Sequence, residues 1–178
     1  MKMKIQKGLS SLKFKDENGN ILATISNQTM FGKGKNIIDK DGQIVYTTNI
    51  INLPKVQEEW NLARLRKYVI FENTRKIAIA NLFLSKNPKR RNSLAFWQRP
   101  SQIDKMDVDT PFGLWVVTRQ PNNGVIVAKN GETIGSLSPF FTCKPQFFEF
   151  SSKYDIAFMV GIFSLASYMM NEEDLIEI

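Results

Sequence analysis

The chain has 178 residues, of which 43% are hydrophobic and 23% are charged, a composition typical of one globular domain. It contains no histidine and a single cysteine, which excludes a Ser-His-Asp triad, a Cys-His pair, an ordinary catalytic zinc site and an internal disulfide. The formal net charge of +7 predicts attraction to polyanions such as nucleic acid, anionic lipid headgroups or acidic proteins. We expect residues 1–178 to form one domain.

Strands dominate the predicted structure up to about Phe150. Residues 1–11 carry lysines but lack the apolar core of a signal peptide, so we do not expect export. The dipeptides Asn18-Gly19 and Asp41-Gly42 each separate two strand-like runs, which predicts two hairpins with type I′ turns. Further strands are expected at residues 68–71 and 77–84. The second of these is apolar on both faces, so both faces should be covered.

Three short strand-like runs follow, at residues 114–117, 125–127 and 133–134. The turn dipeptides Asn123-Gly124 and Asn130-Gly131 separate them, and we expect type I′ turns there as well. This alternation of short apolar runs and turns predicts a β-meander.

Residues 154–170 are predicted to form a helix, because the run from 156 to 170 is free of charge and rich in Ala, Leu and Met. Ser152 and Asp155 have the spacing of an N-terminal capping box, and Asn171 is suited to a left-handed stop. The apolar residues surround the helix instead of forming one stripe, so it must be buried in protein or in lipid.

The length of this helix decides between the two environments. At ~1.5 Å per residue it reaches about 25 Å, which is short of the ~30 Å hydrocarbon core of a bilayer. Small residues at Ala157, Gly161 and Ser164 would let neighbouring strands approach closely. We therefore expect a helix buried inside a soluble β-rich domain and no transmembrane span.

Three segments resemble the tubby C-terminal-like superfamily, which includes the LURP-one-related proteins and the phospholipid scramblases. They are the strand-Asp-Gly-strand unit at residues 38–46, a similar unit at 127–135 and the hydrophobic segment at 154–170. The resemblance implies a mainly β (α+β) fold: a closed antiparallel barrel of about twelve strands around a central buried C-terminal helix. It also implies contact with phospholipid, but no reaction, and no binding motif of these relatives aligns with numbered positions here. Because such a helix fills the barrel, any ligand should be recognised on the outside.

The densest basic stretch lies at residues 86–91 and is followed closely by aromatic residues. Lys and Arg attract anionic headgroups, and Trp favours the membrane interface. We predict a lipid- or anion-binding site made of Lys86, Lys89, Arg90, Arg91, Trp97 and Arg99. The alternative is a solvated connection in which residues 94–97 form a short strand. A second basic group is either part of this site or a solvated face; it comprises Arg64, Arg66, Lys67, Arg75 and Lys76.

Three other motifs are better explained by structural roles than by catalysis or ligand binding. The Gly-Lys-Gly-Lys run at residues 32–35 lacks the GxxxxGK[ST] spacing of a phosphate loop, so we expect a strand connection. Asp104, Asp107 and Asp109 lack the central glycine and terminal glutamate of an EF-hand, and no metal site is predicted. Cys143 has no neighbouring base and is interpreted as a structural cysteine.

We therefore expect a non-enzymatic, cytoplasmic binding module without a cofactor. Its basic outer face should associate peripherally with anionic phospholipid or membrane surfaces. The alternative is a protein-interaction or scaffold domain without lipid binding. Binding to nucleic acid is disfavoured, because the sequence contains no helix-turn-helix, zinc-finger or RNA-recognition signature.

Overall fold

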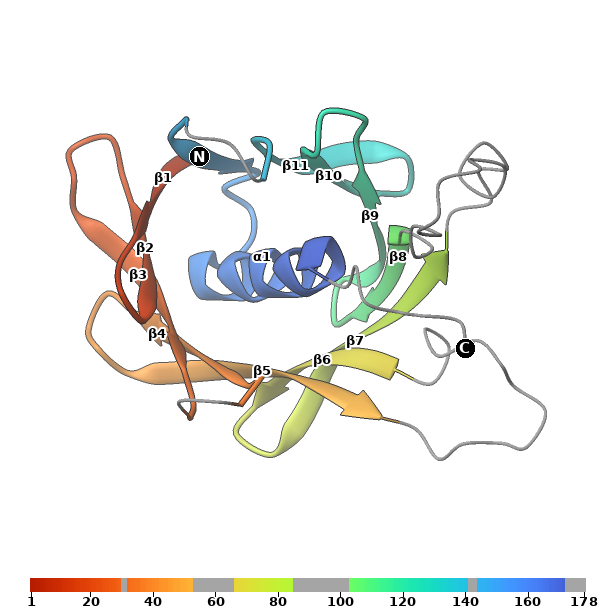
Figure 1. Cartoon of the computed structure of the whole chain (residues 1–178), viewed down its shortest axis with the longest axis horizontal. Helices are drawn as coiled ribbons and strands as arrows, with labels where there is room; N and C mark the ends of the chain where they lie inside the picture. Colours follow the sequence, from red (N-terminus) through yellow and green to blue (C-terminus); the bar gives the residue numbers. More distant parts are fainter. Residues whose placement is uncertain (30–31, 53–65, 85–102, 141–143, 172–178) are drawn as a thin grey trace, which may run out of the picture.

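The computed structural model describes residues 1–29, 32–52, 66–84, 103–140 and 144–171. Twelve antiparallel strands form a closed barrel in which each strand pairs with the next along the chain, and β1 closes the ring by pairing with β12 (Figure 1). The strands are β1 (Lys2–Lys7), β2 (Ser11–Lys15), β3 (Ile21–Asn27), β4 (Lys35–Asp39), β5 (Ile44–Asn52), β6 (Arg66–Glu72), β7 (Arg75–Leu84), β8 (Ile103–Thr110), β9 (Gly113–Arg119), β10 (Val125–Lys129), β11 (Glu132–Leu137) and β12 (Gln146–Phe150). This architecture confirms the predicted fold class.

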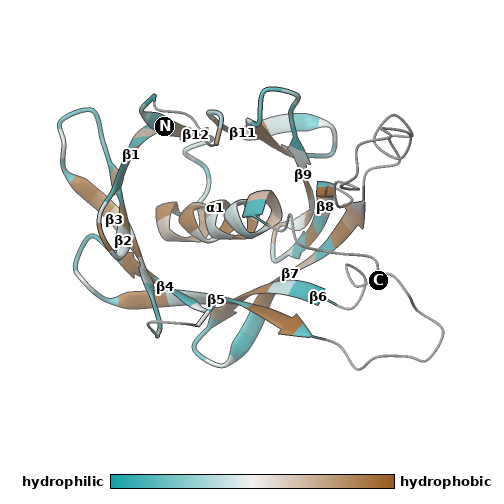
Figure 2. Ribbon diagram, in the orientation of Figure 1, coloured by the Kyte–Doolittle hydropathy of each residue, from teal (hydrophilic) through white to brown (hydrophobic). Residues whose placement is uncertain are grey.

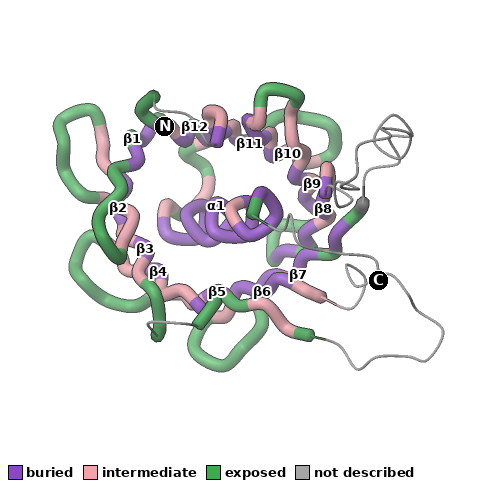
Figure 3. The backbone as a smooth tube through the Cα atoms, viewed as in Figure 1, coloured by how far each residue is buried: buried purple, intermediate pink, exposed green. Residues whose placement is uncertain are grey.

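A single helix, α1 (Ile156–Asn171), lies inside the ring of strands. Of its 16 residues, 13 are buried, and they lie on every side of the helix (Figure 3). Figure 2 shows the hydrophobic colouring along α1 and on the strands that surround it. The apolar circumference of the helix is thus matched by apolar strand faces. Within the described part of the chain, no helix has the length and hydropathy needed to cross a membrane.

The start of α1 differs from the predicted capping box. Asp155, and not Ser152, is the N-cap, because its carboxylate accepts a hydrogen bond from the backbone N–H of Phe158 at 2.8 Å. At the other end Asn171 is still helical, and its side-chain amide donates to the Ser167 carbonyl oxygen at 2.8 Å. Asn171 is therefore a helical residue that satisfies a carbonyl, and the predicted left-handed stop is wrong.

Polar groups fix the C-terminal half of α1 to the wall. The hydroxyl oxygens of Thr48 on β5 and Ser164 lie 2.7 Å apart, and those of Thr48 and Tyr168 lie 3.3 Å apart. The Tyr168 hydroxyl also donates to the backbone carbonyl of Lys33, in the β3–β4 connection. These bonds satisfy the hydroxyl groups of an otherwise apolar core. We call Thr48, Ser164 and Tyr168 the hydroxyl cluster.

The hairpin turns agree with the prediction in position but only partly in type. At Asn130-Gly131 both residues have positive φ angles, of 50° and 83°, as a type I′ turn requires. In the other three loops only one residue of the dipeptide is left-handed: Gly19, Gly42 or Asn123. Those loops are one residue longer. The Gly19 N–H, for example, bonds to the Asp16 carbonyl while the Asp16 N–H bonds to the Asn20 carbonyl. A single left-handed residue is enough to close such a loop.

Candidate functional site

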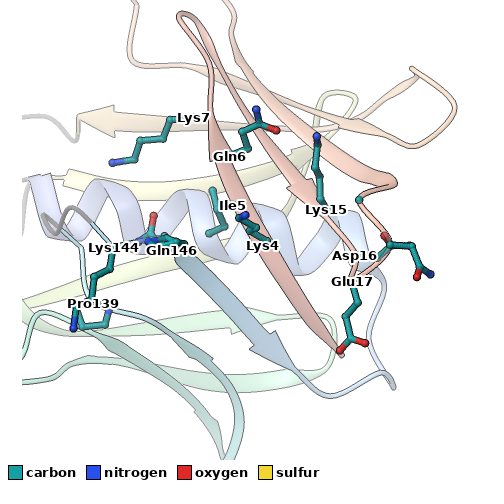
Figure 4. A pocket seen from close by; sticks show the side chains of 13 residues that line it. Lys4, Ile5, Gln6, Lys7, Lys15, Asp16, Glu17, Pro139, Lys144 and Gln146 are labelled. Carbon is teal, nitrogen blue, oxygen red and sulfur yellow. The ribbon is translucent and has the colours of Figure 1, made fainter.

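A groove of about 740 Å³ lies where β1, β2 and the start of β12 meet (Figure 4). Four lysines and two carboxylates line it, so cationic groups outnumber anionic ones. We call this surface the basic groove; the lining residues that bear on its chemistry are Lys4, Lys7, Lys15, Asp16, Glu17, Lys144 and Gln146.

The alternation of β1 and β2 places two of these lysines on the outer wall. Met3 and Ile5 point into the core and are at most 5% exposed, so Lys4 between them points outward. Lys4 pairs directly with Lys15 of β2 in the strand register, which sets two like charges side by side. Directly opposed like charges destabilise a strand pair. An anion bound between them would remove that repulsion.

These lysines have no acidic partners in the described structure. Lys2, on the same strand, forms an ion pair with Glu149 at 2.7 Å, which shows that β1 can pair its lysines with a neighbouring carboxylate. Within the described ranges, neither Lys4, Lys7, Lys15 nor Lys144 takes part in an ion pair. The positive charge of the groove is therefore left free to attract an anion.

A buried amide stands at one end of the groove. Gln146 begins β12 opposite Ile5 and is only 9% exposed. Its Nε2 atom is shielded from solvent and has no hydrogen-bond partner in the described structure. Buried side-chain amides are normally paired, because an unpaired donor loses its bonds to water without replacement. This end of the groove thus holds an unsatisfied donor beside unpaired lysines.

The opposite end of the groove is acidic, and its Asp16 carboxylate already accepts hydrogen bonds from within the chain. Both carboxylate oxygens of Asp16 accept hydrogen bonds from Asn20, at 2.8 Å from its backbone N–H and at 2.9 Å from its side-chain amide. The side-chain bond from Asn20 is the main reason that the pKa of Asp16 lies below its ordinary value. Asp16 therefore stays charged and, together with Glu17, discourages anions at this end.

The predicted site at Lys86, Lys89, Arg90, Arg91, Trp97 and Arg99 lies outside the described residues and stays a prediction. Of the second basic group, Arg64 is also outside. Arg66 and Lys67 begin β6, whereas Arg75 and Lys76 begin β7 after the hairpin turn. Lys76 pairs with Phe71, which lies four residues beyond Lys67 on β6. Lys67 and Lys76 are therefore ~13 Å apart along the strand direction. The structure does not gather these four cations into one site.

The remaining motifs have structural roles or fall outside the described residues. Residues 32–34 connect β3 to β4, and the Gly32 N–H bonds to the Thr29 hydroxyl at 2.9 Å. Asp104, Asp107 and Asp109 all lie on β8, where Asp107 forms an ion pair with Lys105 at 2.9 Å. Among the residues described, no group of three carboxylate or thiol side chains is arranged to hold a metal ion. Cys143 lies outside the described residues.

The comparisons with known proteins bear on the fold. No protein-family model and no curated protein matches the sequence. The structure is similar to the X-ray structure of a protein from Arabidopsis thaliana, AT5G01750, with a TM-score of 0.51 and 11% sequence identity. The alignment covers 94% of this chain and 89% of that chain. The shared fold is all that this likeness shows.

Sequence reasoning missed the basic groove because its lysines are spread over the chain. The β1–β2 hairpin brings Lys4 beside Lys15, but only the closure of β1 onto β12 brings Lys144, from the far end of the chain, to the same groove. A signal was nevertheless present: residues 2–5 and 12–15 alternate Lys with apolar residues. Two such strands in one hairpin place their lysines on a common outer face.

Proposed function

We propose that this protein is a non-enzymatic binding module that associates with anionic phospholipid or membrane surfaces through its basic outer face. The observation that carries the proposal is the basic groove, in which Lys4 and Lys15 oppose each other and have no acidic partner among the described residues. The occupied interior supports it too, since α1 fills the barrel and leaves recognition to the outer surface. A cytoplasmic protein would meet anionic lipid at the inner leaflet of the membrane.

We also propose that the chain is a tubby-like barrel related to the LURP-one-related proteins and the scramblases. A closed twelve-stranded barrel around a hydrophobic C-terminal helix is the architecture which that resemblance implies. The fold similarity to the Arabidopsis thaliana structure supports this at the level of architecture. The lipid role rests on the groove itself.

The test is cosedimentation of the full chain with vesicles, comparing neutral vesicles with vesicles that contain acidic lipid. The double variant Lys4→Gln/Lys15→Gln removes the opposed charges of the groove. Each lysine near an anionic surface contributes ~1 kcal/mol, so we expect roughly thirtyfold weaker binding to acidic vesicles. Added salt should weaken binding of the wild type.

The matched control is Lys129→Gln/Lys153→Gln, which changes the net charge equally but lies outside the groove. We expect it to bind nearly as well as the wild type. Equal losses in both double variants, or binding that ignores headgroup charge and salt, would contradict the proposal. If pull-downs recover one protein partner while vesicles recover nothing, the scaffold alternative is supported instead. Neutralising Lys86, Lys89, Arg90 and Arg91 in the same assay tests the site predicted from the sequence.

A further inference from the structure

We infer that the end of the basic groove at Gln146 is a binding site for a single phosphomonoester group. This deepens the proposed function and rests on it, because it names the ligand chemistry that the groove would select. Lys7, Lys144 and Gln146 line this end, with Lys4 between it and the acidic end (Figure 4).

The first argument is the unsatisfied amide of Gln146. Its cross-strand neighbour is the buried Ile5, and the next inward residue of β12 is Phe148, which is fully buried. An apolar side chain such as leucine would suit these surroundings without leaving a donor unpaired. A polar residue kept at an apolar position without a partner is typical of a functional site. The amide torsion is soft, so the two N–H donors can turn toward a ligand in the groove.

The second argument is the charge distribution. Lys7 and Lys144 offer three N–H donors each, and neither has an ion-pair partner in the described structure. No carboxylate lines this end, since Asp16 and Glu17 belong to the loop after β2. A phosphomonoester carries a charge of ≈ −1.5 to −2 at pH 7 and three acceptor oxygens, which matches several donors better than a singly charged diester does.

The third argument is geometry. Pro145 separates Lys144 from Gln146 and fixes its own φ angle, which restricts the backbone that presents both side chains. Such restriction reduces the entropy lost when a ligand is bound. Lys7 lies three residues beyond Lys4, so it is ~10 Å along β1 from the Lys4–Lys15 pair. A phosphate held by Lys7 and Lys144 is therefore separated along the groove from Asp16 and Glu17, which follow Lys15.

The first experiment is an NMR titration of the full chain with inorganic phosphate. The side-chain amide resonances of Gln146 should shift, and resonances of the Lys76 region should not. Because the chain has no histidine, no side chain with an ordinary pKa changes charge between pH 5.5 and 7.5, whereas the second ionisation of inorganic phosphate falls largely within this range. Affinity should therefore rise over this range. Unchanged Gln146 resonances would overturn the inference.

The second experiment compares vesicles of phosphatidic acid, a monoester, with vesicles of phosphatidylglycerol, a diester, at equal surface charge. The loss of a hydrogen bond to a charged group should lower affinity about tenfold, so Gln146→Leu should remove the preference for phosphatidic acid by that factor. Its Tm should equal or exceed that of the wild type, because an unpaired buried amide is removed. A lower Tm with an unchanged preference would show that Gln146 is structural and would overturn the inference.

The NMR titration and the vesicle comparison together distinguish a lipid headgroup from a soluble phosphate. They also distinguish failure of the phosphomonoester site from failure of the proposed membrane association. A preference for phosphatidic acid assigns the ligand to a lipid headgroup, whereas an NMR shift without vesicle binding supports the site and assigns it to a soluble phosphomonoester. Equal binding to both vesicle types, together with unchanged Gln146 resonances, would overturn this inference and leave the proposed membrane association standing. Binding to neither vesicle type would overturn the membrane association.

Discussion

The hydroxyl cluster in the core of the barrel and the basic groove on its surface differ in whether their polar groups are paired. In the core, Thr48, Ser164 and Tyr168 are buried and bond to one another, so the hydroxyl cluster stabilises the position of α1. In the groove, Lys4 opposes Lys15, and the Gln146 amide is left without a partner in the described structure. Within the described structure the Trp115 Nε1 atom in the core also lacks a partner, so the groove differs from the core in combining an unpaired amide with lysines that form no ion pair. The proposed binding of an anion would explain this difference.

The largest effect on stability is expected for Gly161→Trp, which overpacks the core. A Cβ atom at Gly161 would lie 3.0 Å from the Cδ1 atom of Ile70, so an indole ring has no space between α1 and β6. Overpacking of this size exceeds the usual 1–3 kcal/mol, and we expect the chain not to fold. Circular dichroism and solubility would measure this. Leu114→Trp, at a position 55% exposed, is the control and should fold normally. Soluble, folded Gly161→Trp protein would contradict a tightly filled barrel.

A smaller effect is expected for Tyr168→Phe, which removes the bond to the Lys33 carbonyl and should cost about 1–2 kcal/mol of unfolding free energy. Burial raises the pKa of Tyr168 above its ordinary value. The unfolded phenol ionises near pH ~10, so its stabilisation is complete below that pH and is lost as the pH rises through the higher folded-state pKa. Urea unfolding at pH 8 and pH 11 should show a smaller alkaline loss for Tyr168→Phe. Equal alkaline losses would contradict a buried Tyr168.

Next in size is the helix cap. Asp155→Ala should lower the unfolding free energy by about 1 kcal/mol, because the Phe158 N–H loses its acceptor. Ser152→Ala is the matched control and should change stability by less than ~0.5 kcal/mol, since Ser152 is exposed and does not cap α1. Thermal unfolding measures both. The opposite ranking would restore the capping box expected from the sequence.

The smallest of these effects is a gain in stability, and it is expected in the groove. Lys15→Gln relieves the repulsion with Lys4 and should stabilise the free protein by a few tenths of a kcal/mol at low salt. The gain should shrink as salt screens the charges. Denaturant unfolding at 20 mM and 500 mM salt would show it. Lys13→Gln is the control, because Lys13 lies opposite the neutral Gln6. A similar gain in that variant would show that the stabilisation does not come from relief of the Lys4–Lys15 repulsion.

The local pattern of the sequence predicted most of the barrel. Runs such as residues 77–84 and the Asn-Gly and Asp-Gly dipeptides indicated strands and turns that the structure contains. β1, β8 and β12 were not predicted as strands. The alternation in β1 covers only residues 2–5, the charged pair Asp104-Lys105 interrupts the alternation in β8, and the five residues of β12 give a short pattern. Their strand character follows from pairing with neighbours across the barrel, which no local pattern contains.

By itself the sequence predicted a buried helix at residues 154–170, observed as α1 at Ile156–Asn171, because a segment apolar on all sides and too short to span a bilayer has no other stable place. It also determined that histidine chemistry is excluded. The tertiary structure alone decided where the unpaired cations gather and that Asp155 caps the helix. The closure of β1 onto β12 places Lys4 and Lys7 beside Lys144 and Gln146, from opposite ends of the chain. Such a juxtaposition depends on register across the barrel, and register is a property of paired strands.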